Sequence, residues 1–133
     1  MKKLLISMLI ILGTLTAYGK SNSENSFRLD RVVLTNEIVG KEPLKTMDTF
    51  KLYSKGYFYT EFKDIGEEKT IYHNWYLLQE DGEKTLMASV PLKISGSRWR
   101  TWSNKNLFLS GKWSVEAVDE DDTVLSKKEF NVE

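Results

Sequence analysis

Residues 70–94 have the sequence TIYHNWYLLQ, then EDGE, then KTLMASVPLKI, and this stretch decides the fold class. The Asp81-Gly82 pair lies between two runs rich in apolar, aromatic and β-branched residues. An Asp-Gly pair in that setting is the strongest short-range signal for a β-hairpin. The stretch therefore predicts strands over residues 70–79 and 84–94, joined by a turn at 80–83.

The rest of the chain repeats this pattern of short strands and polar turns. Further strands are predicted at 27–38, 49–62 with a break at Lys55-Gly56, 98–103, 107–109, 113–117 and 123–132. Turns are predicted at 40–43, 64–68, 95–97 and 119–122. Roughly seven short strands without a long amphipathic helix indicate an all-β protein, an antiparallel β-sandwich of immunoglobulin-like type. A partly open β-barrel is the alternative, because it has the same strand statistics.

The N-terminus has the pattern of a signal peptide. Lys2 and Lys3 precede an apolar run over residues 4–15, and small residues follow at 17–19. These features predict a cleaved signal peptide over residues 1–19 and an exported protein, periplasmic or secreted. An uncleaved N-terminal membrane anchor is the alternative. Residues 20–26 are then a polar tether, and residues 27–133 form a single domain.

Composition argues against most catalytic chemistry. The chain has no cysteine and one histidine, so thiol nucleophiles, disulfides and thiolate metal sites are excluded and a zinc site is disfavoured. It contains neither a Gly-x-Ser-x-Gly nucleophile motif nor a glycine-rich phosphate loop. The acidic run at 119–122 lacks the ligand spacing of a calcium loop and predicts a solvated hairpin turn. We expect no catalytic residue, no metal and no cofactor.

Positive charge is concentrated in one segment, since no Asp or Glu occurs between Lys84 and Val115. Cleavage of residues 1–19 removes two of the 19 Lys and Arg and none of the 19 Asp and Glu, which leaves a net charge of −2. This slightly acidic balance argues against nucleic acid as a partner. The bases of the acid-free segment are Lys84, Lys93, Arg98, Arg100, Lys105 and Lys112.

Alternation along a strand divides the block RWRTWS at 98–103 into two faces. Arg98, Arg100 and Trp102 point one way, and Trp99 points the other with Thr101. Burying two unpaired guanidinium groups is too costly. We therefore expect the arginines and Trp102 on the outer face and Trp99 in the core.

Two interpretations of the outer group remain open. In the structural one, Arg100 stacks on Trp102, and the arginines pair with acids such as Glu61 or Glu116. In the functional one, the guanidinium groups hold a carboxylate or phosphate while Trp102 stacks on a ring of the ligand. The candidate ligand-binding residues are Arg98, Arg100, Trp102, Lys105 and His73.

The remaining aromatic residues are assigned by the same alternation. Trp75 and Trp113 are expected in the core. His73 shares strand parity with Trp75, so it is expected to be a hydrogen-bonded structural histidine. The opposite register would expose His73 and bury Asn74, which costs more.

Three motifs together resemble a known family. They are His73-x-Trp75-Tyr76, the block from Arg98 to Ser103 with Lys105 after it, and Gly111-x-Trp113-x-Val115. Over about residues 56–132 the chain resembles the bacterial domain-of-unknown-function family 2914. The resemblance implies a small β domain in an envelope-associated or membrane-attached bacterial protein without an assigned activity. Many relatives carry a basic residue after the histidine, where this chain has Asn74.

These observations favour a non-catalytic binding or interaction module of the cell envelope. Its ligand would be anionic or glycan-like, or its partner another envelope protein. The alternative is a purely structural accessory domain whose arginines are internal clamps. A third interpretation is a hydrolase that uses His73 with a carboxylate.

Overall fold

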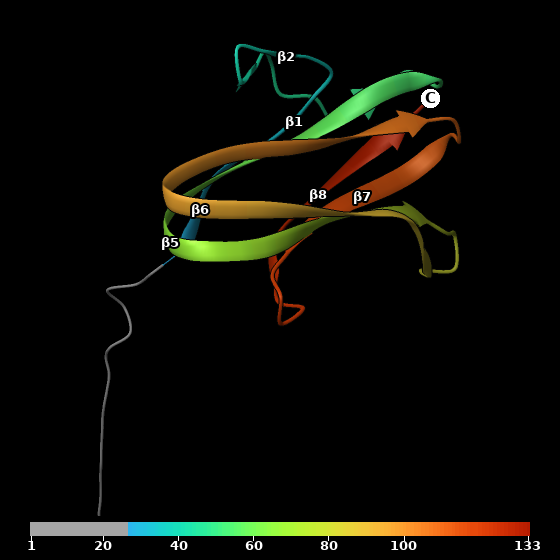
Figure 1. Ribbon diagram of the computed structural model, residues 1–133. Helices are drawn as coiled ribbons and strands as arrows, with labels where there is room; N and C mark the ends of the chain where they lie inside the picture. The colour runs from blue at the N-terminus through green and yellow to red at the C-terminus, as the bar shows by residue number, and fades with distance from the viewer. Residues whose placement is uncertain (1–26) are drawn as a thin grey trace, which may run out of the picture.

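The computed structural model describes residues 27–133, and its regular structure is entirely β (Figure 1). No helix capable of crossing a membrane occurs in this part of the chain. The predicted signal peptide at 1–19 and the tether at 20–26 lie outside the described residues. The strands are β1 (Arg28–Thr35), β2 (Ile38–Val39), β3 (Glu42–Pro43), β4 (Thr49–Phe50), β5 (Ser54–Leu78), β6 (Lys84–Leu107), β7 (Gly111–Val118) and β8 (Val124–Val132).

One long hairpin organises the molecule. β5 and β6 contain 25 and 24 residues and pair antiparallel almost from end to end. Their turn is closed by the bond from the Gln79 amide to the Glu83 carbonyl at 2.7 Å, with Gly82 at φ 91°. The hairpin predicted from the Asp-Gly pair is therefore confirmed.

The long hairpin bends once, at a pair of glycines. Gly66 and Gly96 are register partners, at φ 78° and 86°, and the register shifts on both sides of Gly66. The turns predicted at 64–68 and 95–97 are wrong, because β5 and β6 continue through these residues. A glycine at positive φ with an adjacent bulge bends a ladder without ending it.

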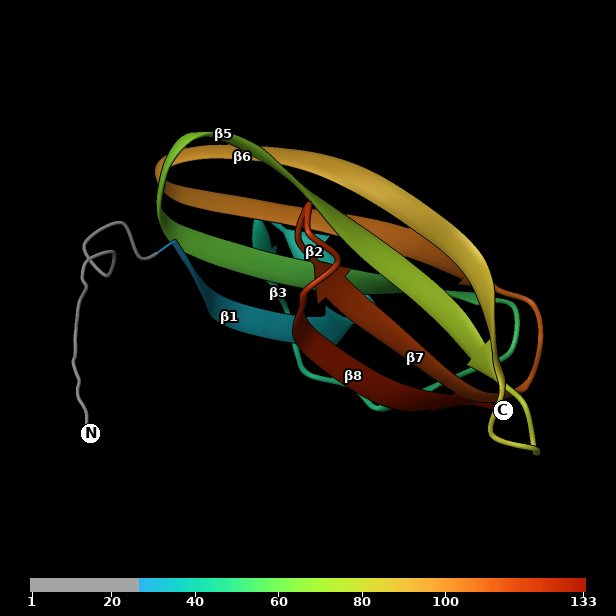
Figure 2. The ribbon, with the colours of Figure 1, turned by 90° about the horizontal axis from the view of Figure 1, so that it is seen from below.

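The bend folds the sheet into two facing layers (Figures 1 and 2). The upper layer of Figure 1 contains β1, residues 54–63 of β5 and residues 98–107 of β6. The lower layer contains residues 69–78 of β5, residues 84–94 of β6, β7 and β8. When the halves of β5 and β6 are counted separately and the two-residue strands β2, β3 and β4 are left out, the strands number seven, as expected. All of these pairs are antiparallel, and only the short β4 pairs parallel, with β8.

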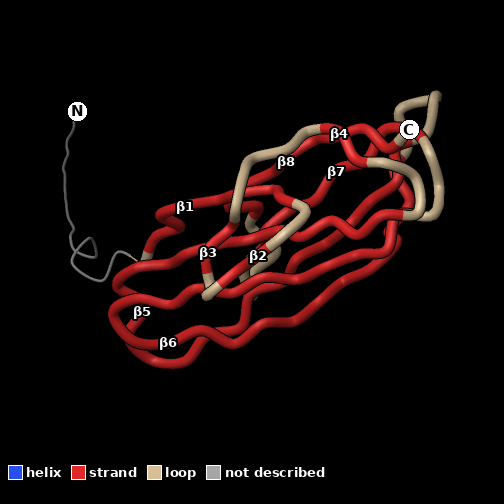
Figure 3. The backbone as a smooth tube through the Cα atoms, turned by 90° about the horizontal axis from the view of Figure 1, so that it is seen from above, coloured by secondary structure: helices blue, strands red, loops and turns tan. Residues whose placement is uncertain are grey.

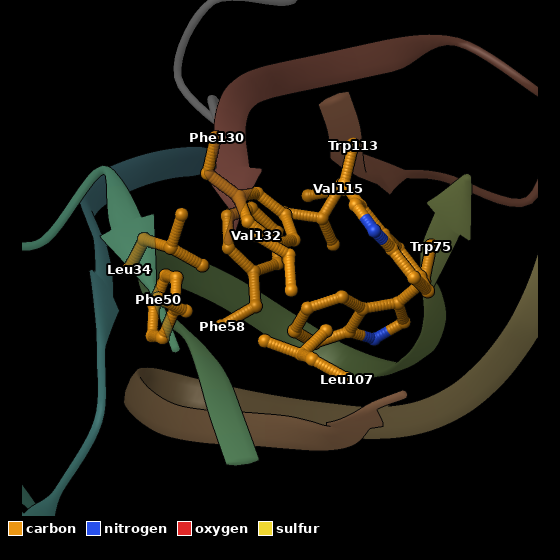
Figure 4. Close-up of a cluster of buried hydrophobic side chains, with 10 residues drawn as sticks. Leu34, Phe50, Phe58, Trp75, Leu107, Trp113, Val115, Phe130 and Val132 are labelled. Carbon is orange, nitrogen blue, oxygen red and sulfur yellow. The ribbon is translucent and has the colours of Figure 1, made fainter. Parts of the chain in front are cut away.

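The hydrophobic core lies between the layers (Figure 4). Trp75 and Trp113 are fully buried there, as predicted, and both pack against Phe130. The strand predicted at 107–109 is wrong, because residues 108–110 form a loop whose Leu109 carbonyl accepts the Trp113 indole N–H at 3.0 Å. The break predicted at Lys55-Gly56 lies earlier, at Tyr53 with φ 70°, and β5 continues through Lys55 and Gly56.

Residues 36–48 form an arm that packs on the outer face of the upper layer (Figure 3). β2 and β3 pair within it, around Gly40 and Lys41 at positive φ. The arm seals Tyr59, whose hydroxyl donates to the Lys41 carbonyl at 3.0 Å. The first strand therefore ends at Thr35, earlier than predicted, and the chain that follows becomes a cover for the sheet.

Candidate functional site

A group of arginines lies on the outer face of the upper layer, beside the arm. Arg31 comes from β1, and Arg98 and Arg100 come from β6. We call these three residues the arginine cluster. Arg98 is exposed and Arg100 is partly exposed, so the predicted outward orientation of both is confirmed.

Two carboxylates hold the arginine cluster in place. Glu61 of β5 is 4% exposed and accepts bonds from the Nε atoms of Arg31, at 3.2 Å, and Arg98. Glu42 of the arm accepts from Arg31 Nη2 at 2.9 Å and from Arg100 Nη1 at 2.6 Å. Hydrogen bonds from Arg31 and then Arg100 lower the pKa of the Glu42 carboxyl, and the bond to Glu61 raises the pKa of Arg98.

Only part of the predicted pairing is present. Glu61 pairs with Arg98 as predicted, whereas the partner of Arg100 is Glu42. The other proposed acid, Glu116, binds Lys84 Nζ at 3.1 Å instead. Sequence reasoning did not find Glu42 because its position opposite β6 depends on how the arm folds back.

The predicted stacking of Arg100 on Trp102 is replaced by another arrangement. Trp102 is half-buried and stacks on Tyr59, with ring centroids 6.0 Å apart and an interplanar angle of 13°. The Arg31 guanidinium lies 5.0 Å from the centre of the same Tyr59 ring. Trp102 is therefore part of the packed outer face and does not present a free ring to a ligand.

Trp99 is the exposed tryptophan, so its predicted place in the core is wrong. Its register partner Phe62 is fully buried, but Trp99 itself is 40% exposed. Phe62 stacks on Phe27 at 5.5 Å, which fills the interior at this end. Trp99 lies on β6 at the margin of the sheet, where an inward-pointing side chain still reaches solvent.

A surface hollow of about 230 Å³ lies beside this tryptophan. Its lining residues are Lys41, Arg98, Trp99 and Arg100. Within residues 27–133, Lys41 takes part in no ion pair, and the Nη atoms of Arg98 have no protein acceptor. These donors are available to a carboxylate or phosphate, and the indole of Trp99 is available for stacking.

Two of the predicted site residues lie elsewhere. Lys105 points to the opposite face from Arg98 and Arg100, with its Nζ atom 4.7 Å from the centre of the Phe108 ring. His73 is fully buried between the layers. The structure therefore brings Arg98, Arg100 and Trp102 into one neighbourhood without Lys105 or His73.

His73 is the centre of a polar chain that crosses the core. Its Nδ1 atom lies 2.8 Å from Ser103 Oγ, and its Nε2 atom lies 3.1 Å from Thr60 Oγ1. The Trp75 indole N–H donates to Ser103 Oγ at 3.1 Å, and the Thr60 hydroxyl donates to the Thr101 carbonyl at 3.4 Å. A neutral His73 protonated on Nε2 satisfies every group in this chain.

Burial lowers the pKa of His73 to about 3, so the imidazole is neutral near pH 7. Its predicted structural role agrees with this geometry. A general base must reach the proton that it abstracts, and a sealed imidazole does not. The hydrolase interpretation therefore loses its proposed base.

The residues that sequence reasoning missed are Arg31, Glu42 and Lys41. They lie on β1 and the arm, outside the acid-free segment that contains Arg98 and Arg100. The usable signal is the apolar Ile38, which lies between Glu37 and the charged pair at 41–42. An apolar residue there indicates that the segment packs against another part of the protein. It does not indicate which face of the sheet is covered.

Comparison with known proteins identifies the second half of the chain. Residues 68–132 match the model of a family described as "Protein of unknown function (DUF2914)". This segment is a DUF2914 sequence. The predicted family is thereby confirmed over β6, β7, β8 and the second half of β5, whereas the arm with Lys41 and Glu42 lies outside the DUF2914 match. No curated relative matches the chain.

Solved structures show the same fold at low sequence identity. An immunoglobulin-like protein from Pseudomonas aeruginosa superposes with a TM-score of 0.54 and 10% identity, over 84% of this chain and 100% of that one. A β-glucosidase from Listeria innocua in complex with glucose gives 0.52 and 13%, over 87% of this chain and 17% of the enzyme. One from Kluyveromyces marxianus gives 0.52 and 18%, over 88% and 15%. The chain thus spans a small part of either glucosidase, and the predicted immunoglobulin-like fold is confirmed.

Proposed function

We propose that this DUF2914-containing domain is a non-catalytic binding module of the bacterial envelope that recognises an anionic ligand. The observation that carries the proposal is the hollow lined by Lys41, Arg98, Trp99 and Arg100. A ligand with a carboxylate or phosphate beside a planar or sugar ring matches this combination of cations and an exposed indole. Export to the envelope is the expectation drawn from residues 1–19.

The charges at the site favour an anion. The three arginines of the cluster pair with two carboxylates, Glu42 and Glu61, and a fourth cation, Lys41, lines the same hollow. The carboxylates hold the guanidinium groups in fixed positions without neutralising them all. A braced donor loses less conformational entropy when it binds, which improves affinity.

Titration with dextran sulfate tests the proposal, with uncharged dextran as the matched polymer. We expect the full chain to bind dextran sulfate, with an affinity that falls as salt is raised. Lys41→Gln and Arg98→Gln should each weaken binding by about two- to fivefold, the effect of one lost surface charge contact. Lys93→Gln is the control, because Lys93 is a base of the same strand that pairs only with the exposed Glu68.

Two results would overturn the proposal. One is equal binding of the charged and uncharged polymers. The other is a Lys41→Gln variant that binds dextran sulfate as tightly as the Lys93→Gln control does.

The second candidate is a structural accessory domain, and one observation favours it. Each member of the arginine cluster binds a carboxylate, and Glu42 connects the arm to both β1 and β6. If these contacts only clamp the arm, Arg100→Ala should lower the melting temperature while no anion binds. An Arg100→Ala protein as stable as the parent removes this candidate.

A further inference from the structure

The second half of β6, residues 98–107, is an open sheet edge. In the described part of the chain, β6 pairs with β5 alone. Its register with β5 is unbroken from Arg98 to Leu107. This segment contains no proline and no glycine, so a regular backbone edge about ten residues long faces away from β5.

Exposed edges are usually blocked, and the two halves of β6 differ in this respect. The first half contains Pro91, which lacks an amide, and a register shift opposite Trp75 and Tyr76. The second half has neither feature. Its arginines are tied back onto the outer face by Glu61 and Glu42, so they do not shield the edge.

Charge decides which kind of strand fits this edge. No acidic residue occurs between Lys84 and Val115. A second copy that paired through its own residues 98–107 would place only cationic and neutral side chains beside Arg98 and Arg100. Like charges on adjacent strands destabilise the pair, whereas opposite charges stabilise it. The edge therefore favours an acidic strand over a copy of itself.

We infer that residues 98–107 of β6 bind an extended acidic peptide segment, which adds to the upper layer as a further strand. The inference rests on the proposed function, because the same cations take part. Adjacent strands lie about 4.8 Å apart, and their side chains alternate between the two faces. One face of the added strand meets Arg98, Arg100 and Lys41, and the other meets Trp99. The preferred segment thus alternates acidic and apolar residues.

Three synthetic peptides and the unmodified full chain test the inference. The first peptide alternates Glu and Val over ten residues. The second has the same composition in two blocks, five Glu followed by five Val. The third is the alternating peptide with every backbone amide methylated, which keeps the side-chain charges and removes the ladder donors on both edges of the strand. All three peptides are tested against the same unmodified protein, so no result depends on whether a variant folds.

We expect the alternating peptide to bind at least tenfold more tightly than either of the other two. Amide hydrogen exchange should slow at alternate residues within 98–107 and stay unchanged in β1, the other edge of the upper layer. Equal affinity for all three peptides, or no added protection in 98–107, would overturn the inference. If dextran sulfate still bound in that case, the proposed anion site would stand while strand addition failed.

Discussion

His73 Nδ1 and Ser103 Oγ lie 2.8 Å apart, although the two residues belong to opposite layers of the sandwich. Ser103 also accepts the indole N–H of Trp75, so two buried rings meet at one hydroxyl. The chain has no cysteine, and this polar link joins the layers in a domain that has no disulfide to do so.

Stability is expected to fall as the pH drops below about 6.5. The pKa of His73 is about 3 in the folded protein and about 6.5 in an unfolded chain. Between these values the unfolded chain binds a proton that the folded protein excludes. The stability present above pH 6.5 is therefore lost toward pH 3, at no more than ~1.4 kcal/mol per pH unit. Urea denaturation at pH 7, 6 and 5 measures this slope.

The matched variant for this experiment is His73→Gln. His73 is the only histidine, so its removal should flatten the dependence between pH 7 and 5, above the range in which most carboxylates titrate. A His73→Gln protein with the parent's slope would show that another group is responsible.

Replacing Ser103 with alanine should destabilise the fold by about 1–3 kcal/mol. The change leaves the Trp75 indole N–H without an acceptor and His73 Nδ1 without its partner, both inside the core. Urea denaturation of the variant measures the loss. Ser97→Ala, at an exposed position of the same strand, should change little. Equal costs for the two substitutions would contradict a role for the buried hydroxyl.

Replacing Gly66 with alanine should cost about 1–2 kcal/mol through backbone strain alone. The residue has φ 78°, and a Cβ atom built there meets nothing within 4 Å. Gly66→Asn should cost less, because asparagine adopts the left-handed region more readily. Thermal denaturation of the two variants gives the comparison. If asparagine proves as costly as alanine, left-handed strain is not what the bend imposes.

Glu61→Gln should destabilise the protein by about 1–3 kcal/mol. A glutamine has a single acceptor oxygen, so it cannot replace both carboxylate oxygens that bind Arg31 and Arg98. Glu129→Gln is the control, since Glu129 forms an exposed pair with Lys127. Chemical denaturation of both variants measures the two losses of stability. A Glu61→Gln protein as stable as the Glu129→Gln control would rule out a bracing role for the Glu61 carboxylate.

Local patterns were sufficient for much of the fold. The Asp-Gly turn predicted the central hairpin, and alternation predicted the burial of Trp75, Trp113 and His73 and the outward direction of Arg98 and Arg100. Each of these features depends on residues close together along one strand, where side-chain direction follows from the backbone period of two. The same alternation predicted the wrong burial for Trp99, because the direction of a side chain does not determine whether another element covers it.

The sequence by itself determined the β class, the core face of each central strand and the acid-free character of β6. Only the tertiary structure decided that the turns expected at 64–68 and 95–97 are bends in continuous strands, and that the arm carries Lys41 and Glu42 across to the arginine cluster. It also decided that Trp99 is the exposed indole while Trp102 stacks on Tyr59. These features depend on contacts between residues far apart in the chain, which no local periodicity encodes.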